Sequence, residues 1–528
     1  MPNAATETTS YDLLPYPPLS FPATHLARLA AIGRIFGLPT ADPARARVLE
    51  LGCGSGINLV AQAQLFPEAE FVGIDTSSTQ IETGVAAAAA AGTGRVRLIC
   101  GDVSEIGGDF GQFDYIITHG LFSWVPEPVK DAILRISREN LKPDGIAYIS
   151  YNCLPGWRMR GALRDMMLMH TAGIQDLRGK VAQGKALIKF LAECCHKDSA
   201  YGEFLRQQLQ MLTNVDDSYI AHEFLADEND AMYFVDFVKK AAEHRLAYLS
   251  DADVSSMVSA NLPSQAAQTL RSLNFDLFST EQYMDFVRNR TFRSTLLCHA
   301  DREPDRNVEP SRLDTLQVGT FIALKDRARG GKPAVFTNSG GLELIVQEPA
   351  NAIVFEKVAA LGPDFQPVPA FLDEIVAEPG AKLPGRDAAA KRAFAARVLL
   401  QGYLRRMLEF TAGPLVLRTA DSPNPESLPL ARWQSENQYL VSSHRLDMHN
   451  FDAFMRKFIA LCDGTRNRSA LIEAMGAALD NKEYQLNENN QPITDPDRAR
   501  FIIEKLHDNT LENLRRLGLL LPANDRLN

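Results

Sequence analysis

The chain has 528 residues, more than one hydrophobic core usually holds, so several domains are expected. Its net charge of −10 argues against a general nucleic-acid-binding protein, because such a protein needs a basic surface to displace the counterions of the phosphates. No stretch approaches the ~18 apolar residues that a membrane span requires. We therefore expect a multidomain protein with no nucleic-acid partner and no membrane span.

The first 25 residues are rich in proline and aromatic residues, which favours an extended segment lying against a surface. Residues 24–37 have the apolar spacing of a helix. From 47 to about 155, strand patterns (47–51, 70–75, 96–102, 113–120 and 145–152) alternate with helix patterns (57–65, 77–91 and 127–140). This alternation predicts an α/β fold with an open, mostly parallel, Rossmann-like sheet and crossover helices.

The pattern changes after Trp157, where the strand signals stop. Residues 158–213 and 217–300 have helical spacing, with short polar breaks. A charged, proline-containing linker at 301–310 precedes a stretch in which strand patterns mix with turn residues. A second linker at 378–387 precedes a mainly helical end. We therefore expect helical and mixed α+β domains to follow the parallel sheet.

Seven cysteines are scattered along the chain, and no two of them form a CxxC pair. Neither a zinc ribbon nor a disulfide framework is predicted, and we expect no metal. The N-terminus lacks the basic and apolar regions of a signal peptide. These features favour a cytoplasmic protein.

The strongest motif is VLELGCGSG at residues 48–56. An apolar strand carries Glu50 near its end, Gly52, Gly54 and Gly56 follow at alternate positions, and a helix then begins. Glycine allows a tight turn and a close approach to a ligand, and the helix directs its first N–H groups toward that ligand. The motif predicts a ligand at the carboxyl end of the first strand.

Acidic residues end the next two strands. Asp75 follows the second strand, where its carboxylate can accept hydrogen bonds from both hydroxyls of a ribose. Asp102 follows the third strand and can accept from an adenine amine, while the Val103 N–H can meet an adenine ring nitrogen. The third glycine of a dinucleotide fingerprint would fall at Ile57, so the spacing favours S-adenosylmethionine over a dinucleotide.

Together, ELGCGSG, GID and GDV resemble the three motifs of the class I methyltransferases. The segments at 11–17, 119–126 and 151–157 resemble a bacterial family that joins this core to a methyltransferase regulatory domain. Residues 219–225 and 285–299 resemble that domain, and 462–475 resembles the winged-helix-like end of the same architecture. The resemblance covers most of the chain and includes the rickettsial lysine methyltransferases that act on an outer-membrane protein.

This resemblance implies an enzyme that transfers methyl from S-adenosylmethionine to a lysine amine of a protein. A small-molecule or natural-product methyltransferase and a non-catalytic sensor that binds S-adenosylmethionine remain as alternatives. The implied partners are a protein substrate, such as a cell-envelope protein, or an unknown small molecule, and a second copy of the chain in a homodimer.

With the resemblance, the chain divides into six predicted segments. They are an N-terminal lid and helix (1–40), a cofactor-binding methyltransferase core (41–155), a helical dimerisation region (156–215), a helical regulatory domain (216–305), a mixed α/β segment (306–387) and a winged-helix-like domain (388–528).

The predicted cofactor-binding residues are those of the three motifs together with a leader tyrosine and polar residues near the strand ends: Tyr16, Glu50, Gly52, Cys53, Gly54, Gly56, Asp75, Thr76, Gln80, Asp102, Val103 and His119. We interpret Tyr16 as part of a lid over the pocket, with a plain surface strap as the alternative.

The acceptor side is expected at the carboxyl ends of the fourth and fifth strands. The predicted catalytic residues there are His119, Tyr151, Asn152 and Trp157. Phe122 and Trp124 either line an amine channel or belong to the core. A free lysine has a pKa near ~10.4, so a lysine methyltransferase must favour the neutral amine by desolvation or by accepting its proton.

Overall fold

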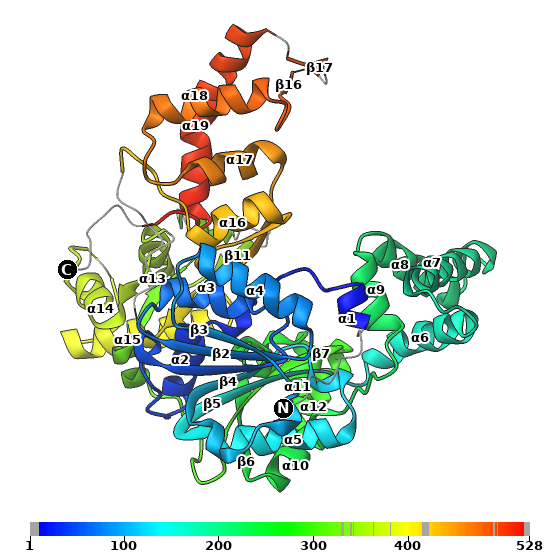
Figure 1. Ribbon diagram of the computed structural model, residues 1–528. Coiled ribbons are helices and arrows are strands. Elements are labelled where there is room, and N and C mark those ends of the chain that lie inside the picture. The colour runs from blue at the N-terminus through cyan, green and yellow to red at the C-terminus, as the bar shows by residue number, and fades with distance from the viewer. Residues whose placement is uncertain are drawn as a thin grey trace.

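A seven-stranded sheet forms the centre of the protein (Figure 1). The computed structural model describes residues 10–320, 322–328, 332–337, 341, 343–362, 364–380, 382–413, 422–488, 491–493 and 495–521. The strands are β1 (Arg47–Leu51), β2 (Glu70–Asp75), β3 (Val96–Cys100), β4 (Phe113–Thr118), β5 (Leu141–Asn152), β6 (Leu246–Asp251) and β7 (Phe292–His299). Their order is β3-β2-β1-β4-β5-β7-β6, and β7 runs opposite to the other six strands. The predicted open, mostly parallel sheet is confirmed.

Helices cover both faces of this sheet because the side chains of each strand alternate between two apolar cores. In β5, Ile146 and Tyr148 pack in the core that contains α2 (Leu26–Ile35) and α3 (Ile57–Leu65). Ala147 and Ile149 pack in the opposite core, with α5 (Glu127–Glu139) and α10 (Phe234–Glu243). Helix α4 (Ser78–Ala90) follows β2 and contacts both α3 and β3. The predicted helices at 57–65, 77–91 and 127–140 are therefore confirmed.

The prediction that 217–300 is entirely helical is wrong at β6 and β7. These two strands complete the sheet, so it extends well past residue 155. The helical parts of this stretch are α10, α11 (Ser264–Leu273) and α12 (Leu277–Arg288). The apolar pattern of β7 is interrupted by Arg293, which is fully buried and pairs with Asp285 and Glu281 of α12. A charged residue inside a strand breaks the apolar pattern by which a strand is predicted. The carboxylates of α12 offset the cost of burying this charge.

Of the five α-helices between β5 and β6, the first four project from one side of the sheet (Figure 1). They are α6 (Trp157–Thr171), α7 (Leu177–Cys194), α8 (Ala200–Thr213) and α9 (Asp217–Phe224). They share a core of their own, which includes Met167, Ile188, Leu212 and Phe224. The short helix α1 (Ser10–Leu13) lies beside α9 in Figure 1, and Leu14 packs against this core.

A mixed α/β body follows the sheet. Its strands and helices are β8 (Gln317–Gly319), β9 (Ala323–Asp326), β10 (Ala334–Thr337), β11 (Glu343–Val346), α13 (Pro349–Ala360), β12 (Gln366–Pro367), α14 (Val368–Ala377), α15 (Ala388–Tyr403) and β13 (Glu409–Thr411). Leu399 of α15 and Phe410 of β13 share one core with Phe371 of α14. The predicted boundary at 387 therefore falls inside this body, because β13 pairs with β8 across the linker.

The last part of the chain, from α16 onward, forms a separate bundle with its own core (Figure 1). It comprises α16 (Pro429–Asn437), β14 (Leu440–Ser442), β15 (Met448–Asn450), α17 (Ala453–Leu461), α18 (Arg468–Asp480), β16 (Asn487–Glu488), β17 (Gln491–Pro492) and α19 (Pro496–Arg516). Among the helices that the structure describes, none is both long and apolar enough to cross a bilayer.

Candidate active site

A cavity of about 660 Å³ opens where the parallel strands end. Of the residues predicted from the sequence, its lining includes Tyr16, Glu50, Gly52, Cys53, Gly54, Asp75, Thr76, Gln80, Asp102, Val103, His119, Asn152 and Trp157. Residues outside the predicted set also line it, among them Phe21, Trp124, Arg160, Tyr219, Glu223, Thr291 and Phe292. The structure thus brings most of the predicted residues into one cavity, although they come from several segments of the chain.

The glycine turn forms the floor of the cavity. Gly54 has a φ of 53°, and its N–H donates to Oδ2 of Asp75 at 2.8 Å. Gly56 is placed differently from the prediction, because it does not line the cavity. It precedes α3 with a φ of 67°, and a Cβ there would lie 2.5 Å from Cδ2 of Leu98 in β3. Glycine is required at 56 for the backbone turn and for packing on β3.

Asp75 and Asp102 are both fixed by backbone donors while facing the cavity. Oδ1 of Asp75 accepts from the Ser77 N–H at 3.0 Å, and burial raises the pKa of this carboxyl above its ordinary value. Oδ1 of Asp102 accepts from the N–H and hydroxyl of Ser104, at 2.8 and 2.7 Å. Each carboxylate keeps further lone pairs for a ligand, as hydroxyl and amine donors of an adenosyl group require.

Glu50 has an unpaired buried oxygen beside the glycine turn. Its Oε1 accepts from the side-chain amide of Asn58 at 3.0 Å, whereas Oε2 has no hydrogen-bond partner among the described residues. Burial raises the pKa of Glu50 to about 8. Glu50 therefore holds a proton at neutral pH in the free protein, and a cationic ligand group beside Oε2 would favour the ionised carboxylate. The ammonium of S-adenosylmethionine fits this requirement, so the residues present suit that cofactor.

His119 at the end of β4 is held by an aromatic stack and a hydrogen-bond chain. Its ring stacks on Phe21 with centroids 3.8 Å apart, and Nδ1 lies 2.9 Å from the Tyr148 hydroxyl. That hydroxyl donates to Oγ of Ser294 at 2.9 Å, so Nδ1 of His119 carries the proton and Nε2 keeps a lone pair. Burial lowers the pKa of His119 to about 4, which keeps the ring neutral beside a cationic cofactor.

Tyr151 is a correction to the predicted catalytic set. Its side chain points to the face of the sheet covered by α10, where it stacks on Phe237 with centroids 4.1 Å apart. It is 1% exposed, and its hydroxyl pairs with Thr295 at 3.2 Å. Successive residues of a strand face opposite sides, so Asn152 reaches the cavity and Tyr151 belongs to the core.

The aromatic candidates after β4 and β5 divide between core and cavity. Trp124 and Trp157 line the cavity, with ring centroids 6.2 Å apart in an edge-to-face arrangement. Phe122 is 1% exposed and packs edge-to-face on Phe237, so it belongs to the core.

The N-terminal leader lies over the cavity. Tyr16 packs against His222 of α9 with ring centroids 4.7 Å apart, and Nε2 of His222 lies 2.6 Å from the carbonyl oxygen of Leu14. Phe21 is fixed by the bond from its N–H to the side-chain oxygen of Asn58 at 3.0 Å. The leader therefore joins the projecting helices to the glycine-turn side of the cavity, the arrangement that a lid requires.

Sequence reasoning missed Glu223, Arg160 and Tyr219, which reach the cavity from α6 and α9. Burial raises the pKa of Glu223 to about 7, while the charge of Arg160 and a hydrogen bond from Tyr16 oppose that rise. Arg160 donates to the Tyr219 hydroxyl at 3.1 Å and lies over the ring of Trp157. No local motif marks these residues. The segment 219–225 is noted in the sequence for its family resemblance. The acidic stretch 222–234 indicates a solvated face or, alternatively, a docking surface for a basic, lysine-bearing substrate, without placing Glu223 in the cavity.

Family models match three stretches of the chain. A methyltransferase domain matches residues 48–145, a predicted methyltransferase regulatory domain matches 216–299, and the C-terminal winged helix domain of PKMT matches 424–519. The regulatory match spans β6 and β7, so its residues complete the central sheet and supply one wall of the cavity.

Two Rickettsia relatives cover nearly the whole chain. The uncharacterized protein RP789 of Rickettsia prowazekii is 30% identical over 97% of this chain and 93% of its own length. The structure of PKMT2 from Rickettsia typhi in complex with AdoHcy superposes with a TM-score of 0.84 at 29% identity, over 96% of this chain and all of that one. A second structure of PKMT2 from Rickettsia typhi superposes with a TM-score of 0.83. The chain therefore belongs to the family of these Rickettsia proteins, and it is a class I methyltransferase whose cofactor is S-adenosylmethionine.

Proposed function

We propose that this enzyme methylates the side-chain amine of a lysine in a protein substrate. The observation that carries the proposal is the acceptor side of the cavity, where one carboxyl with a pKa near 7, Glu223, stands among aromatic rings. The aromatic rings that line this cavity are those of Tyr16, Phe21, Trp124, Trp157, Tyr219 and Phe292. This combination suits an ammonium group, because aromatic faces attract a cation and a carboxylate can take its proton.

Bound S-adenosylmethionine supplies an electrophilic methyl group. The residues that would hold it are the glycine turn, Asp75, Asp102 with Val103, and Glu50. The neutral ring of His119 adds no positive charge next to it. The leader residues Tyr16 and Phe21 exclude water from the same cavity, which strengthens electrostatic interactions inside it.

Glu223 is proposed as the proton acceptor. The ionised carboxylate first pairs with the incoming lysine ammonium and then takes its proton at a carboxylate oxygen, which leaves the amine neutral for attack. A carboxyl of ordinary pKa would hold the ammonium as an ion pair, whereas one with a pKa near 7 shares the proton more readily near neutral pH. Tyr16 and Arg160 hold Glu223 in place by a hydrogen bond and by charge.

Asn152 and Trp157 are proposed to orient the amine. Asn152 is fixed by the bond that its backbone N–H donates to Oγ of Ser123 at 2.8 Å. Trp157 is held between Trp124 and Arg160. Both side chains therefore keep one orientation at the cavity wall, as positioning of an attacking atom requires.

Labelled cofactor tests the substrate class. The purified protein is incubated with S-adenosylmethionine carrying a labelled methyl group and with cell-envelope or total protein extract, and methylated residues are located by mass spectrometry. We expect label on lysines of protein bands. Label confined to small molecules would overturn the proposal and favour a small-molecule methyltransferase.

Glu223→Gln tests the proposed base. We expect kcat/KM to fall by about 10² or more. The wild type should lose activity below pH 7 as Glu223 becomes protonated, and this loss should be absent from the variant because no carboxyl remains to be protonated. Glu228→Gln, an exposed glutamate on the same segment, is the control and should retain the wild-type profile. An unchanged profile in Glu223→Gln would remove this residue from the mechanism.

A further inference from the structure

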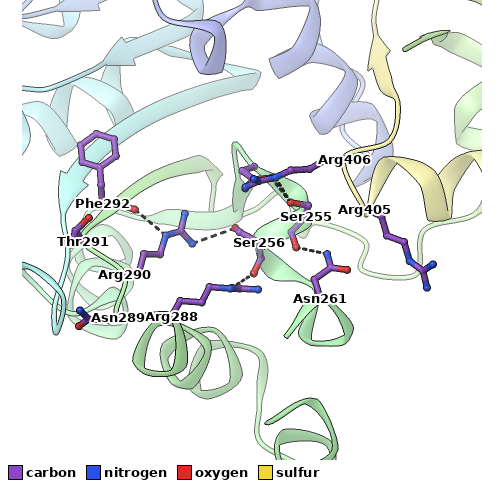
Figure 2. A pocket seen from close by; sticks show the side chains of 11 residues that line it. Ser255, Ser256, Asn261, Arg288, Asn289, Arg290, Thr291, Phe292, Arg405 and Arg406 are labelled. Carbon is purple, nitrogen blue, oxygen red and sulfur yellow. Dashed lines mark hydrogen bonds and ion pairs between the residues drawn. The ribbon is translucent and has the colours of Figure 1, made fainter. Parts of the chain in front are cut away.

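A second cavity, of about 620 Å³, adjoins the active-site cavity. Thr291 and Phe292 line both of them. The second cavity lies where the loop after β6 and the end of α12 meet the segment that follows α15, and Figure 2 shows the side chains around it. It therefore lies between the part of the chain that matches the regulatory domain and the mixed α/β body.

Four arginines line this cavity, and two of them lack a carboxylate partner. Arg290 pairs with the buried Asp251 at 2.7 Å, and Arg406 pairs with Asp253. Arg288 donates only to the backbone carbonyl of Ser256, at 2.6 Å. The guanidinium of Arg405 is exposed, and it has no hydrogen bond or ion pair to any residue that the structure describes.

The lining therefore carries four guanidiniums and one carboxylate, that of Asp253, which pairs with Arg406. Burial lowers the pKa of Arg288, and repulsion from the neighbouring Arg290 lowers it further, while the carboxylates of Asp285, Glu281 and Asp253 oppose the shift. The carboxylates of Asp251 and Asp285, beside Arg290, are at most 1% exposed, and neither residue lines the cavity. Guanidinium groups bind carboxylates and phosphates through paired N–H donors, so an anionic group is the ligand that relieves this repulsion.

The position of Phe292 connects this charge to the acceptor side of the active site. Phe292 pairs with Asn152 across the β5–β7 ladder, and its ring packs edge-to-face on His119 with centroids 5.9 Å apart. A polypeptide that presents its lysine beside Asn152 therefore passes Phe292, and its neighbouring residues enter the arginine-lined cavity.

We infer that this cavity binds acidic side chains that flank the acceptor lysine of the substrate, so that Arg288 and Arg405 select lysines in acidic sequence. The inference rests on the proposed lysine methylation, and it adds a specificity site to that activity. This second cavity holds a carboxylate of the substrate while the lysine occupies the active-site cavity, so no chemical step takes place in it.

Synthetic peptides with a single lysine test this inference. Glutamates occupy the positions two to five residues before the lysine in one peptide and after it in another, and glutamines replace them in matched controls. We expect the wild type to show a kcat/KM about 5- to 10-fold higher for one of the acidic peptides than for its glutamine control. Arg405→Gln should abolish this preference, and Arg405→Lys should retain part of it because the charge remains. Arg516→Gln, at an exposed position on α19, is the matched control and should keep the full preference.

The variants lie outside the cofactor-binding set, so an unchanged affinity for S-adenosylmethionine reports that each one is folded. Equal rates on acidic and neutral peptides would overturn the inference and leave lysine methylation standing. Inhibition by inorganic pyrophosphate without any acidic preference would also overturn it, since the cavity would then bind a free anion.

A binding measurement separates this failure from failure of the proposed function. Anisotropy of a fluorescein-labelled acidic peptide, with norleucine in place of lysine, follows binding without methyl transfer. Binding that Arg405→Gln weakens, with no lysine methylated in any peptide or protein, would overturn lysine methylation while supporting a carboxylate site. Binding that is unaffected by Arg405→Gln would overturn the inference.

Discussion

At the scale of single residues, the active site depends on carboxyl groups held away from their ordinary pKa. Glu50 and Glu223 both line the cavity, and burial raises the pKa of each. Glu50 stands beside the glycine turn with an unpaired oxygen, whereas Glu223 stands among the aromatic rings of the acceptor side. In the free protein, the ionised form of each carboxyl is less stable than that of an ordinary surface carboxyl, as is common for groups in ligand-binding sites.

Glu50→Gln should stabilise the cofactor-free protein at alkaline pH. The pKa of Glu50 is about 8 in the folded state and near 4.5 in the unfolded chain, so the folded state holds a proton that the unfolded chain releases between these values. The stability of the wild type therefore falls as pH rises from about 4.5 to 8. Glutamine does not ionise and keeps an oxygen for Asn58.

We expect Glu50→Gln to exceed the wild type in unfolding free energy by about 1–3 kcal/mol at pH 8.5 and by much less at pH 5, measured by urea denaturation. Its affinity for S-adenosylmethionine should fall, because the neutral amide pairs less well with an ammonium. Glu68→Gln at an exposed position is the control. A difference that does not change with pH would show that the Glu50 carboxyl titrates in its ordinary range.

At the scale of elements, the glycine turn is shaped by the helix that packs on it. Gly84 of α4 lies so close to the turn that a Cβ would be 1.8 Å from the carbonyl oxygen of Ser55 and 2.6 Å from Cδ1 of Leu98. Backbone atoms cannot move aside as a flexible side chain can. The approach of α4 therefore sets the position of the turn that holds the cofactor.

Gly84→Ala should displace α4 and disturb the turn. We expect a loss of about 1–3 kcal/mol in unfolding free energy, together with weaker binding of S-adenosylmethionine in calorimetry. Gly476→Ala in α18 is the matched control, because nothing lies within 4 Å of a Cβ at that helical position. That change should stabilise the protein slightly, since alanine favours a helix. Cofactor affinity unchanged in Gly84→Ala would contradict the role given to this contact.

At the scale of the whole molecule, charged residues connect parts of the chain that are far apart in sequence. Glu409 of β13 accepts from Arg445 of the C-terminal part at 3.1 Å and is coupled to Arg28 of α2. Burial acts to raise the pKa of Glu409, but the charges of Arg28 and Arg445 hold it below its ordinary value. The homodimer that the sequence predicts stays a prediction, and sedimentation equilibrium would test it.

Glu409→Gln should therefore destabilise the full chain at neutral pH. The carboxylate has a lowered pKa in the folded state, so its contribution is present above the unfolded value and is lost as pH falls through the folded one. We expect the substitution to lower the unfolding free energy by about 1–3 kcal/mol at pH 7 and by a smaller amount at pH 4. The loss should be less than for a fully buried ion pair, because Glu409 is 24% exposed. Glu512→Gln, in a surface pair with Arg516, should change stability by less than about 1 kcal/mol. Equal effects of the two substitutions would contradict the role of Glu409.

The sequence by itself determined the parallel part of the sheet and the cofactor side of the site. Strand periodicity, the glycine turn after β1 and the acids after β2 and β3 are local features, and local features are readable from spacing alone. Because parallel strands all end at the same edge of a sheet, these residues had to meet. The cavity contains them together, apart from Gly56, whose role is packing.

Only the tertiary structure decided which residues stand opposite the cofactor. The side to which Tyr151 points depends on strand alternation at the end of β5, and a one-residue difference exchanges core and cavity. Glu223 and Phe292 arrive from segments more than seventy residues beyond β5, and β7 was hidden because Arg293 finds its partners on α12. Contacts between distant segments leave no periodic trace in the sequence, since each is fixed by packing against the folded sheet and not by its neighbours along the chain.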